Sequence, residues 1–529
     1  MTFPARCAAG IDAISAWALL AVVAVVLVVV SAKTLHSPID YDEGYNLQVV
    51  DNLAKGIGYA SYGAIRDAKP WPFDPDITTG PAILMPMAVF WKLTGGSILA
   101  VRIFMIALFW AYLAGVYRLW SGQGRPLLAA AAAMASTLCF LYLPMGRLVG
   151  EISAAAAIVW SAWAVARDRP ILAGLLAGIA VQIKFVYGLA GAVLIVGYLA
   201  VLVAQRPPGW LRTSLWAVVA PVIPTAAFEL YRLCCLGDLR AYGNSLWEFH
   251  EFLRGQSLST NHLSWHDPAR LGFKLEGAWL MLPHAAWAVI GIAILTLLAT
   301  ATLDALRRSD AQGVPSPAPQ DAPAATAAIT SAHDRLRASL FAMAMFALAV
   351  GGLLMLLGWL VLSAQPSQRQ GLPFMLFFFP AVTGLAACCY AQLAKRIRST
   401  AGALLLRAPM LLCVALLIAG LCHKAFVTTH AKLAEHAREQ LQIAALIRAS
   451  GAKSIWVDRW WQDPEFLVLS GVPGLTSRTA EPQLYIVTDI EVEIDHLDWE
   501  QQKPKFARII YQSPMAMVGF LPPPVPPAK

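Results

Sequence analysis

Charged residues are scarce in this 529-residue sequence. Asp, Glu, Lys and Arg together make up 14% of it, whereas a soluble globular domain carries about 25%. Hydrophobic residues make up 58%, and the mean hydropathy is +0.59. This composition excludes a soluble globular protein and predicts a protein embedded in a lipid bilayer.

Cysteine spacing excludes two further classes. The sequence has eight cysteines, which include the adjacent pairs Cys234-Cys235 and Cys388-Cys389, but it has no CxxC and no Cys/His ligand spacing. Neither a zinc module nor a disulfide framework is therefore expected. The net charge of +8 does not indicate nucleic-acid binding either, because the basic residues lie in short loops between apolar runs.

Long apolar runs recur along the chain. A membrane-crossing helix needs about 20 apolar residues, and on this criterion we expect about eleven crossings. They fall at residues 14–32, 98–120, 126–144, 150–166, 170–187, 188–204, 213–231, 279–301, 338–362, 372–392 and 402–421. The apolar segment 79–95 is short and contains Pro81 and Pro86, so a juxtamembrane or re-entrant helix is expected there. The predicted fold is a mainly α, polytopic membrane protein.

Basic residues cluster in alternate loops, as Arg167 and Arg169 do. Loops of this kind face the cytoplasm. We therefore expect a multi-pass membrane protein with a cytoplasmic N-terminus. The segments expected on the external side are 33–97, 232–278 and 422–529.

The chain divides into two predicted domains. Residues 1–422 form the membrane domain, in which the Ala- and Pro-rich segment 309–333 indicates a disordered cytoplasmic loop. Residues 423–529 begin with a helical pattern and continue in short apolar runs bounded by Gly, Pro and Asp. This order predicts a small external α/β domain with a Pro-rich tail.

The first external loop opens with the acidic stretch Asp40-Tyr41-Asp42-Glu43, soon after the first apolar run. Carboxylates at a membrane face lose solvation energy unless they are paired or used, so this stretch is a candidate site. The alternative is that Asp40 or Asp42 only caps the helix that follows, with Gly56 just past its end. The two interpretations are compatible, because a helix N-terminus also offers N–H groups to a phosphate.

Two charged residues in apolar surroundings are the next candidates. Glu151 lies at the external end of a predicted crossing, where it either forms an i,i+4 salt bridge with Arg147 or faces the acidic stretch. Lys184 lies in a run otherwise free of charge, so it either pairs with a carboxylate or phosphate or extends its amine to the membrane surface. The external arginines Arg270 and Arg369 suit an anionic lipid headgroup.

The external loop 232–278 contains His262 and His266, four residues apart. On a helix this spacing places both imidazoles on one face, as in metal sites, whereas the nearby Pro268 favours a loop. Together with Asp76 of the first loop, these histidines are the candidate ligands for a divalent metal, the one cofactor for which the sequence offers candidates.

With these residues placed, the chain resembles the GT-C membrane glycosyltransferases, most closely the bacterial relatives of protein O-mannosyltransferases and of the lipid A aminoarabinose transferase. The resemblance covers about residues 1–200. The residues that carry it are Asp42-Glu43, Gly56, Phe90-Trp91-Lys92-Leu93-Thr94-Gly95, Ala100-Val101-Arg102, Glu151, Gly174, Gly178 and Lys184.

The chain departs from this pattern in the first external loop. The lipid A branch has a Glu-Lys-Pro-Pro stretch where residues 77–81 of this sequence read ITTGP. The acid and the lysine that contact metal and phosphate are missing there, although Asp74 and Asp76 are near in sequence. The departure weakens the expectation of aminoarabinose as substrate and of a metal requirement.

The resemblance implies an inverting transfer of a hexosyl or pentosyl group on the periplasmic side of the bacterial inner membrane. The external segments and the C-terminal α/β domain are therefore expected in the periplasm. The implied donor is a polyprenyl-phosphate sugar, and the implied acceptor is a glycan, lipid or protein of the cell envelope. A carboxylate takes the proton of the acceptor hydroxyl; Asp42 is the expected base, and Glu43 or Glu151 is expected to orient the acceptor or the sugar. Cations stabilise the charge on the leaving phosphate. The expected phosphate ligands are Lys184, Arg270 and Arg369.

Two other classes of function remain open. A lipid or sugar transporter or flippase also places charged residues within the membrane, and a polymer-export subunit would use the C-terminal domain for docking. No internal repeat relates the two halves of the sequence, and the candidate site is concentrated in one external loop. Convergence of Asp42, Glu151 and Lys184 on one external site would favour the enzyme, and a continuous polar path to the cytoplasmic face would favour transport.

Overall fold

The computed structural model describes residues 3–524 with internal gaps. The gaps are residues 63–69, 122–125, 141–146, 258–270, 273, 277–288, 290, 293–294, 297–323, 362–371, 397–399, 424–429, 458–463, 476 and 489–497. Arg270, Arg369, His262 and His266 all lie outside the described residues.

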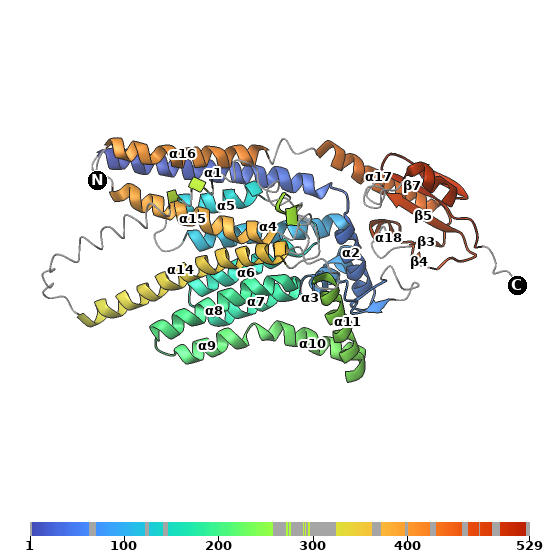
Figure 1. The fold of residues 1–529 in the computed structure, drawn as a ribbon, viewed down its shortest axis with the longest axis horizontal. Coiled ribbons are helices and arrows are strands. Elements are labelled where there is room, and N and C mark those ends of the chain that lie inside the picture. Colours follow the sequence, from blue (N-terminus) through green and yellow to red (C-terminus); the bar gives the residue numbers. More distant parts are fainter. Residues whose placement is uncertain are drawn as a thin grey trace.

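Residues 3–422 form a bundle of helices (Figure 1). Its members are α1 (Phe3–Leu35), α2 (Tyr41–Ala54), α3 (Pro81–Leu93), α4 (Ile98–Trp120), α5 (Leu127–Phe140), α6 (Glu151–Ala166), α7 (Pro170–Ile183), η1 (Phe185–Tyr187), α8 (Gly188–Gln205), α9 (Trp210–Val219), α10 (Val222–Leu236), α11 (Leu239–Ser257), α14 (Ala324–Val361), α15 (Leu372–Arg396) and α16 (Thr400–Cys422). A short antiparallel pair, β1 (Ala60–Ser61) and β2 (Trp71–Pro72), joins α2 to α3.

Six helical stretches in the described part of the chain are long and apolar enough to cross a membrane. They are Ile11–Leu35, Ile98–Trp120, Phe185–Gln205, Trp210–Leu236, Asp334–Leu360 and Phe374–Ala391. Four more of the predicted crossings coincide with shorter apolar helices, and most of 279–301 lies outside the described residues. The structure therefore supports a multi-pass membrane protein, while the predicted number of about eleven crossings stays a prediction.

The crossing expected at 213–231 lies within the stretch Trp210–Leu236, which is long and apolar enough to cross a membrane and is interrupted at Pro221 between α9 and α10. One predicted boundary is wrong in detail. The segment 309–333, predicted to be disordered, is helical from Ala324 onward because its Ala-rich end continues into the apolar run of α14. The short α3 has 13 residues, too few to span a bilayer, as Pro81 and Pro86 led us to expect.

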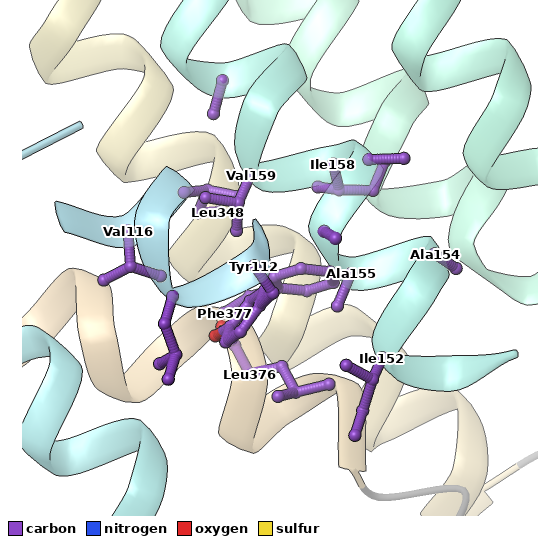
Figure 2. Close-up of a cluster of buried hydrophobic side chains, with 14 of the residues drawn as sticks. Tyr112, Val116, Ile152, Ala154, Ala155, Ile158, Val159, Leu348, Leu376 and Phe377 are labelled. Carbon is purple, nitrogen blue, oxygen red and sulfur yellow. The ribbon is translucent and has the colours of Figure 1, made fainter. Parts of the chain in front are cut away.

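The interior of the bundle is filled by apolar side chains. Figure 2 shows Tyr112 and Val116 of α4 packed with Ile158 of α6, Leu348 of α14 and Phe377 of α15. Alanines along α6 let its neighbours approach closely, as small residues do between membrane helices. The Tyr112 hydroxyl, which is buried here, donates a 2.7 Å hydrogen bond to the Leu376 carbonyl oxygen.

The outer surface of the bundle is also apolar. Large hydrophobic side chains on α1, α4 and α9 are more than half exposed, as Trp17 (64%), Ile103 (52%) and Leu211 (67%) illustrate. An apolar outer surface of this extent is unfavourable in water and suits contact with lipid.

We call residues 430–524 the C-terminal unit. Its elements are α17 (His430–Ala449), β3 (Ser454–Trp456), α18 (Pro464–Ser470), β4 (Gly474–Leu475), β5 (Gln483–Thr488), α20 (Trp499–Gln502), η5 (Lys503–Lys505), β6 (Arg508–Gln512) and β7 (Ala516–Phe520). The strands form a sheet in the order β4-β3-β5-β7-β6, with β3 parallel to β4 and β5 and with β7 antiparallel to β5 and β6.

Both faces of this sheet are covered. Ile443 and Ile447 of α17 pack with Ile455, Leu484 and Val518 on one face. On the other face Tyr485, Val487 and Leu521 form a second cluster. The C-terminal unit lies beyond the end of the bundle that carries α2 and α3, and α18 packs against α2 (Figure 1).

Candidate active site

The acidic stretch forms the beginning of α2. Asp40 is the N-cap, and its side chain accepts a 2.9 Å hydrogen bond from the Glu43 backbone N–H. Asp42 and Glu43 occupy the first turn, where the helix dipole favours negative charge. Gly56, just past the end of the helix, has a φ of +79°, which glycine adopts without strain. The expected capping role therefore falls to Asp40.

An ion pair joins Asp40 to a segment that is distant in sequence. One carboxylate oxygen of Asp40 pairs with Nη1 of Arg147, just before α6. The alternative in which Arg147 pairs with Glu151 across one helical turn is wrong, because α6 begins at Glu151 and Arg147 precedes the helix. The i,i+4 geometry therefore does not apply to this pair.

Glu43 is fully buried and forms a bidentate ion pair with Arg102 of α4. Nε and Nη2 of Arg102 donate to its two oxygens at 3.0 and 2.8 Å. The same guanidinium donates to the carbonyl oxygens of Ser37 (2.5 Å) and Pro38 (3.2 Å). Burial raises the pKa of Glu43, and the guanidinium opposes that shift. The pair ties α2 and the loop before it to α4.

Lys184 is placed by a break in the helix. α7 ends at Ile183, and Lys184 is extended, with φ −150° and ψ 109°, before η1 begins. Its Nζ lies 3.4 Å from Oε1 of Glu151 and 3.5 Å from Oγ1 of Thr78. Only 13% of the Lys184 side chain is exposed, so the amine pairs with a carboxylate instead of extending to the membrane surface.

The loop before α3 connects these groups. Thr79 Oγ1 and the Leu148 carbonyl oxygen accept hydrogen bonds of 3.0 and 2.6 Å from the Asn46 side-chain amide of α2. The Gly80 N–H donates a 2.8 Å bond to the Ile183 carbonyl oxygen. A Cβ at Gly80 would lie 2.1 Å from the Gln182 carbonyl oxygen, so only glycine permits this approach.

The three ion pairs therefore converge at one end of the bundle. Asp40 interacts electrostatically with both Glu43 and Glu151, and Glu151 lies beside Lys184. Carboxylates from α2 and α6, a lysine after α7 and the loop before α3 form one polar site next to α2. Of the predicted site residues in the described part of the chain, the structure brings Glu43, Glu151 and Lys184 together around Asp40, and Asp42 precedes Glu43 in the first turn of α2.

Asp74 and Asp76 form a separate acidic pair in the first loop. The buried Asp74 accepts hydrogen bonds from the hydroxyls of Tyr45 (2.7 Å) and Ser61, and Oδ1 of Asp74 accepts one from the Asp76 N–H at 2.9 Å. Burial and then the neighbouring Asp74 raise the pKa of Asp76 to about 6. Within the described residues no group of three or more His, Cys, Asp or Glu side chains is placed to hold a metal ion, and the proposed ligand role of Asp76 stays a prediction.

Sequence reasoning did not assign four residues to this site. Two of them could have been found from the sequence, because Arg102 is part of the Ala-Val-Arg motif and Arg147 is an isolated cation in an external loop. No feature of the sequence points to Thr78 or Tyr187. The Tyr187 hydroxyl is buried beside Glu151 and has no hydrogen-bond partner in the structure as described.

Removing Arg102 should destabilise the protein. Arg102→Met leaves the Glu43 carboxylate buried without its partner, which typically costs about 3–5 kcal/mol. We expect a clearly lower melting temperature in detergent, and a largely restored one in the double variant Arg102→Met/Glu43→Leu, where no charge is left buried. A single variant as stable as wild type would show that the pair does not hold α2 to α4.

The raised pKa of Asp76 predicts a pH-dependent stability. Its pKa rises from an ordinary 3.8 to about 6 on folding, so the folded protein binds this proton more tightly than the unfolded chain does. The associated stability is present at low pH and is lost as the pH rises through about 6. We therefore expect the melting temperature of Asp76→Asn minus that of wild type to become larger as the pH is raised from about 4 to about 7. A difference that is constant with pH would contradict the assignment.

Comparison with known proteins gives a family match over part of the chain and a similar fold. The model of Glycosyltransferase family 87 matches residues 78–314. The solved structure of ArnT from Cupriavidus metallidurans bound to undecaprenyl phosphate is similar, with a TM-score of 0.55, 14% identity, and coverage of 95% of this chain and 98% of that chain. The same protein in the apo state matches with a TM-score of 0.46 and 14% identity, over 96% of this chain and 98% of that one.

No protein among the curated sequences matches this chain significantly. The fold shared with ArnT extends over nearly the whole of both chains, well beyond the N-terminal region on which the sequence resemblance rested. The family match includes the loop before α3, Glu151 and Lys184. Taken together, the family match and the shared fold support the resemblance to the GT-C membrane glycosyltransferases.

Proposed function

We propose that this protein transfers a hexosyl or pentosyl group, with inversion, from a polyprenyl-phosphate donor to a glycan, lipid or protein acceptor of the cell envelope. The reaction takes place on the periplasmic side of the bacterial inner membrane, with the N-terminus in the cytoplasm. The observation that carries the proposal is that the start of α2, where Asp40 is the N-cap and Asp42 lies in the first turn, is close to the Glu151–Lys184 pair. The undecaprenyl phosphate bound to ArnT, which has a similar fold, supports a polyprenyl-phosphate lipid as the donor.

The lipid donor has two parts, and the protein offers a suitable surface for each. The polyprenyl chain is apolar and matches the exposed hydrophobic side chains of the bundle. The phosphate is anionic and matches Lys184, whose Nζ already faces a carboxylate oxygen at 3.4 Å. Arg270 and Arg369 complete the proposed phosphate ligands on the strength of the sequence alone.

The reaction is a direct displacement at the anomeric carbon. The acceptor oxygen forms a bond to that carbon while the bond from the carbon to the phosphate oxygen breaks. The acceptor proton passes to a carboxylate, and the electron pair of the broken bond stays on the lipid phosphate. Lys184 stabilises the charge that grows there.

Asp42 is the carboxylate we assign as base. The acids on either side of it hold the first turn of the helix: Asp40 caps α2 and pairs with Arg147, and both oxygens of Glu43 bind Arg102. In this proposal Glu43 therefore acts by holding the loop, and Glu151 orients the acceptor or the sugar. Asp42 is half-buried in the first turn of α2, the end of a helix at which acidic side chains are favourable.

The interior of the bundle argues against the transport alternative. Apolar side chains of α4, α6, α14 and α15 pack directly on one another in the centre of the bundle (Figure 2). A transport path needs polar groups leading from the external site to the cytoplasmic face. The packing in Figure 2 supports surface chemistry at the α2 end over passage between these helices.

Asp42→Asn should lower the transfer rate by about 10²–10⁴-fold, because the amide cannot accept the acceptor proton. The measurement is transfer of radiolabelled sugar from polyprenyl-phosphate donors in proteoliposomes, with envelope acceptors supplied. Asp51→Asn is the matched control on the same helix, since Asp51 pairs with the exposed Lys55. Near-normal transfer by Asp42→Asn would remove Asp42 from the role of base.

Lys184→Met should lower the rate constant for transfer by about 10²–10³-fold, because a donor to the developing phosphate charge is lost. Lys184→Arg keeps the charge and should retain more activity than the methionine variant. The rates are compared in the same proteoliposome assay under saturating donor. Equal activity of Lys184→Met and wild type would place the phosphate elsewhere.

A further inference from the structure

We infer that the C-terminal unit is a positioning element of the active site, and that Gln440 is the positioning residue through which it holds the acidic stretch. The inference rests on the proposed function for its catalytic meaning. It assigns a role to a part of the chain that contributes no group to the reaction. Three contacts carry it.

The first contact is between Gln440 of α17 and the main chain of Ile39. The Gln440 Oε1 accepts from the Ile39 N–H at 2.9 Å, and the Gln440 Nε2 donates to the Ile39 carbonyl oxygen at 2.9 Å. One side-chain amide thus satisfies both polar groups of one residue, as a neighbouring strand would. Ile39 directly precedes the N-cap Asp40, and its side chain is buried.

The second contact is a close approach between α18 and α2. A Cβ placed on Gly44 would lie 2.7 Å from the Glu465 backbone nitrogen and 3.0 Å from the Pro464 carbonyl carbon. Gly44 is one residue from Glu43 in the first half of α2. The absence of a side chain at Gly44 is what lets α18 rest on the helix that carries Asp42.

The third contact is made by α18, whose side chains pack in two hydrophobic cores, that of the C-terminal unit and that of the membrane bundle. Phe466 is buried in the core of the C-terminal unit, beside Ile447. Val468 and Leu469 pack against the core of the membrane bundle. A seven-residue helix therefore couples the sheet to the bundle at the place where α2 begins.

Neighbouring residues of α17 are anchored to the rest of the C-terminal unit and so fix the position of Gln440. The preceding residue, Glu439, accepts hydrogen bonds from the hydroxyls of Tyr511 (3.1 Å) and Ser513 near the β6–β7 turn. One turn further, Ile443 is buried against the sheet. The Gln440 amide is thus fixed by the C-terminal unit, and through it the main chain at Ile39 is fixed as well.

A catalytic carboxylate must be held to within about 0.5 Å of its productive position. From the bundle side, Arg102 binds the carbonyl oxygens of Ser37 and Pro38 just before Ile39, and Arg147 pairs with Asp40. The C-terminal unit holds the stretch from Ile39 to Asp42 from the opposite side. Loss of this hold should slow the chemical step while leaving donor binding at Lys184 nearly unchanged.

The test that separates positioning from mere stability is Gln440→Glu. The carboxylate still accepts from the Ile39 N–H but presents a second acceptor to the Ile39 carbonyl oxygen, so one of the two hydrogen bonds is lost. We expect kcat for sugar transfer to fall by about 10–100-fold at pH 7.5, the size of effect caused by a small misplacement, with donor KM within about twofold. As the pH falls toward the ordinary glutamate value of about 4.3, the protonated carboxyl donates again, so the ratio to wild type at each pH should recover.

Gln440→Ala should show a comparable loss of kcat without recovery at low pH. A ratio to wild type that is the same for both variants at every pH would overturn the role of the amide. Loss of kcat and a raised donor KM by the same factor would also overturn it, because that pattern indicates general damage to the site.

A second measurement does not depend on activity. Hydrogen exchange of the peptide over residues 36–47, followed by mass spectrometry, should be faster in Gln440→Ala and in Gly44→Ala than in wild type. Alanine is the better helix former, so helix propensity alone predicts equal or slower exchange in Gly44→Ala. Gly243→Ala in α11 is the matched control, since a Cβ there meets nothing within 4 Å.

The two measurements distinguish a failure of this inference from a failure of the proposed function. Unchanged exchange in both Gln440→Ala and Gly44→Ala would overturn the inference even if the wild-type protein transfers sugar. Faster exchange in a protein that transfers no sugar from any donor supplied would uphold the contact and overturn the proposed function.

Discussion

Burying charge next to a bilayer is the constraint on which this site depends. Two buried pairs of opposite charge lie at the α2 end of the bundle: Glu43 with Arg102, and Glu151 with Lys184. An isolated charge in such surroundings is strongly disfavoured. The pairs therefore do more than hold the helices together, because they also fix carboxylates and a cation in one place at the membrane surface.

The different roles of the acidic residues at the start of α2 follow from their interaction partners. Asp40 and Glu43 are held by a helix N-terminus and by two arginines, so they define where the first turn of α2 lies. Asp42 lies between them in the sequence, and its backbone position is fixed by theirs. The apolar interior below this end of the bundle keeps the polar chemistry at one surface, and the C-terminal unit reaches the same stretch from outside through Gln440.

Much of this could be predicted from the sequence, because apolar runs and isolated charges are local signals. The apolar runs indicated a multi-pass helical protein, and Asp42, Glu43, Glu151 and Lys184 stood out as charges beside them. Their pairing could not be predicted. The Asp40–Arg147 pair joins residues 107 positions apart, and the Gln440–Ile39 contact joins residues 401 positions apart. The i,i+4 rule, applied to Arg147, failed because the helix begins four residues later.

The central claim is that α2, Glu151 and Lys184 form one site for a lipid-linked sugar phosphate. The most direct test is an experimental structure of the protein in a lipid nanodisc with a polyprenyl phosphate bound. The account predicts a phosphate oxygen within about 3 Å of the Lys184 amine, on the side that faces the first turn of α2. A phosphate bound at the opposite end of the bundle, away from Lys184 and the acidic stretch, would contradict it.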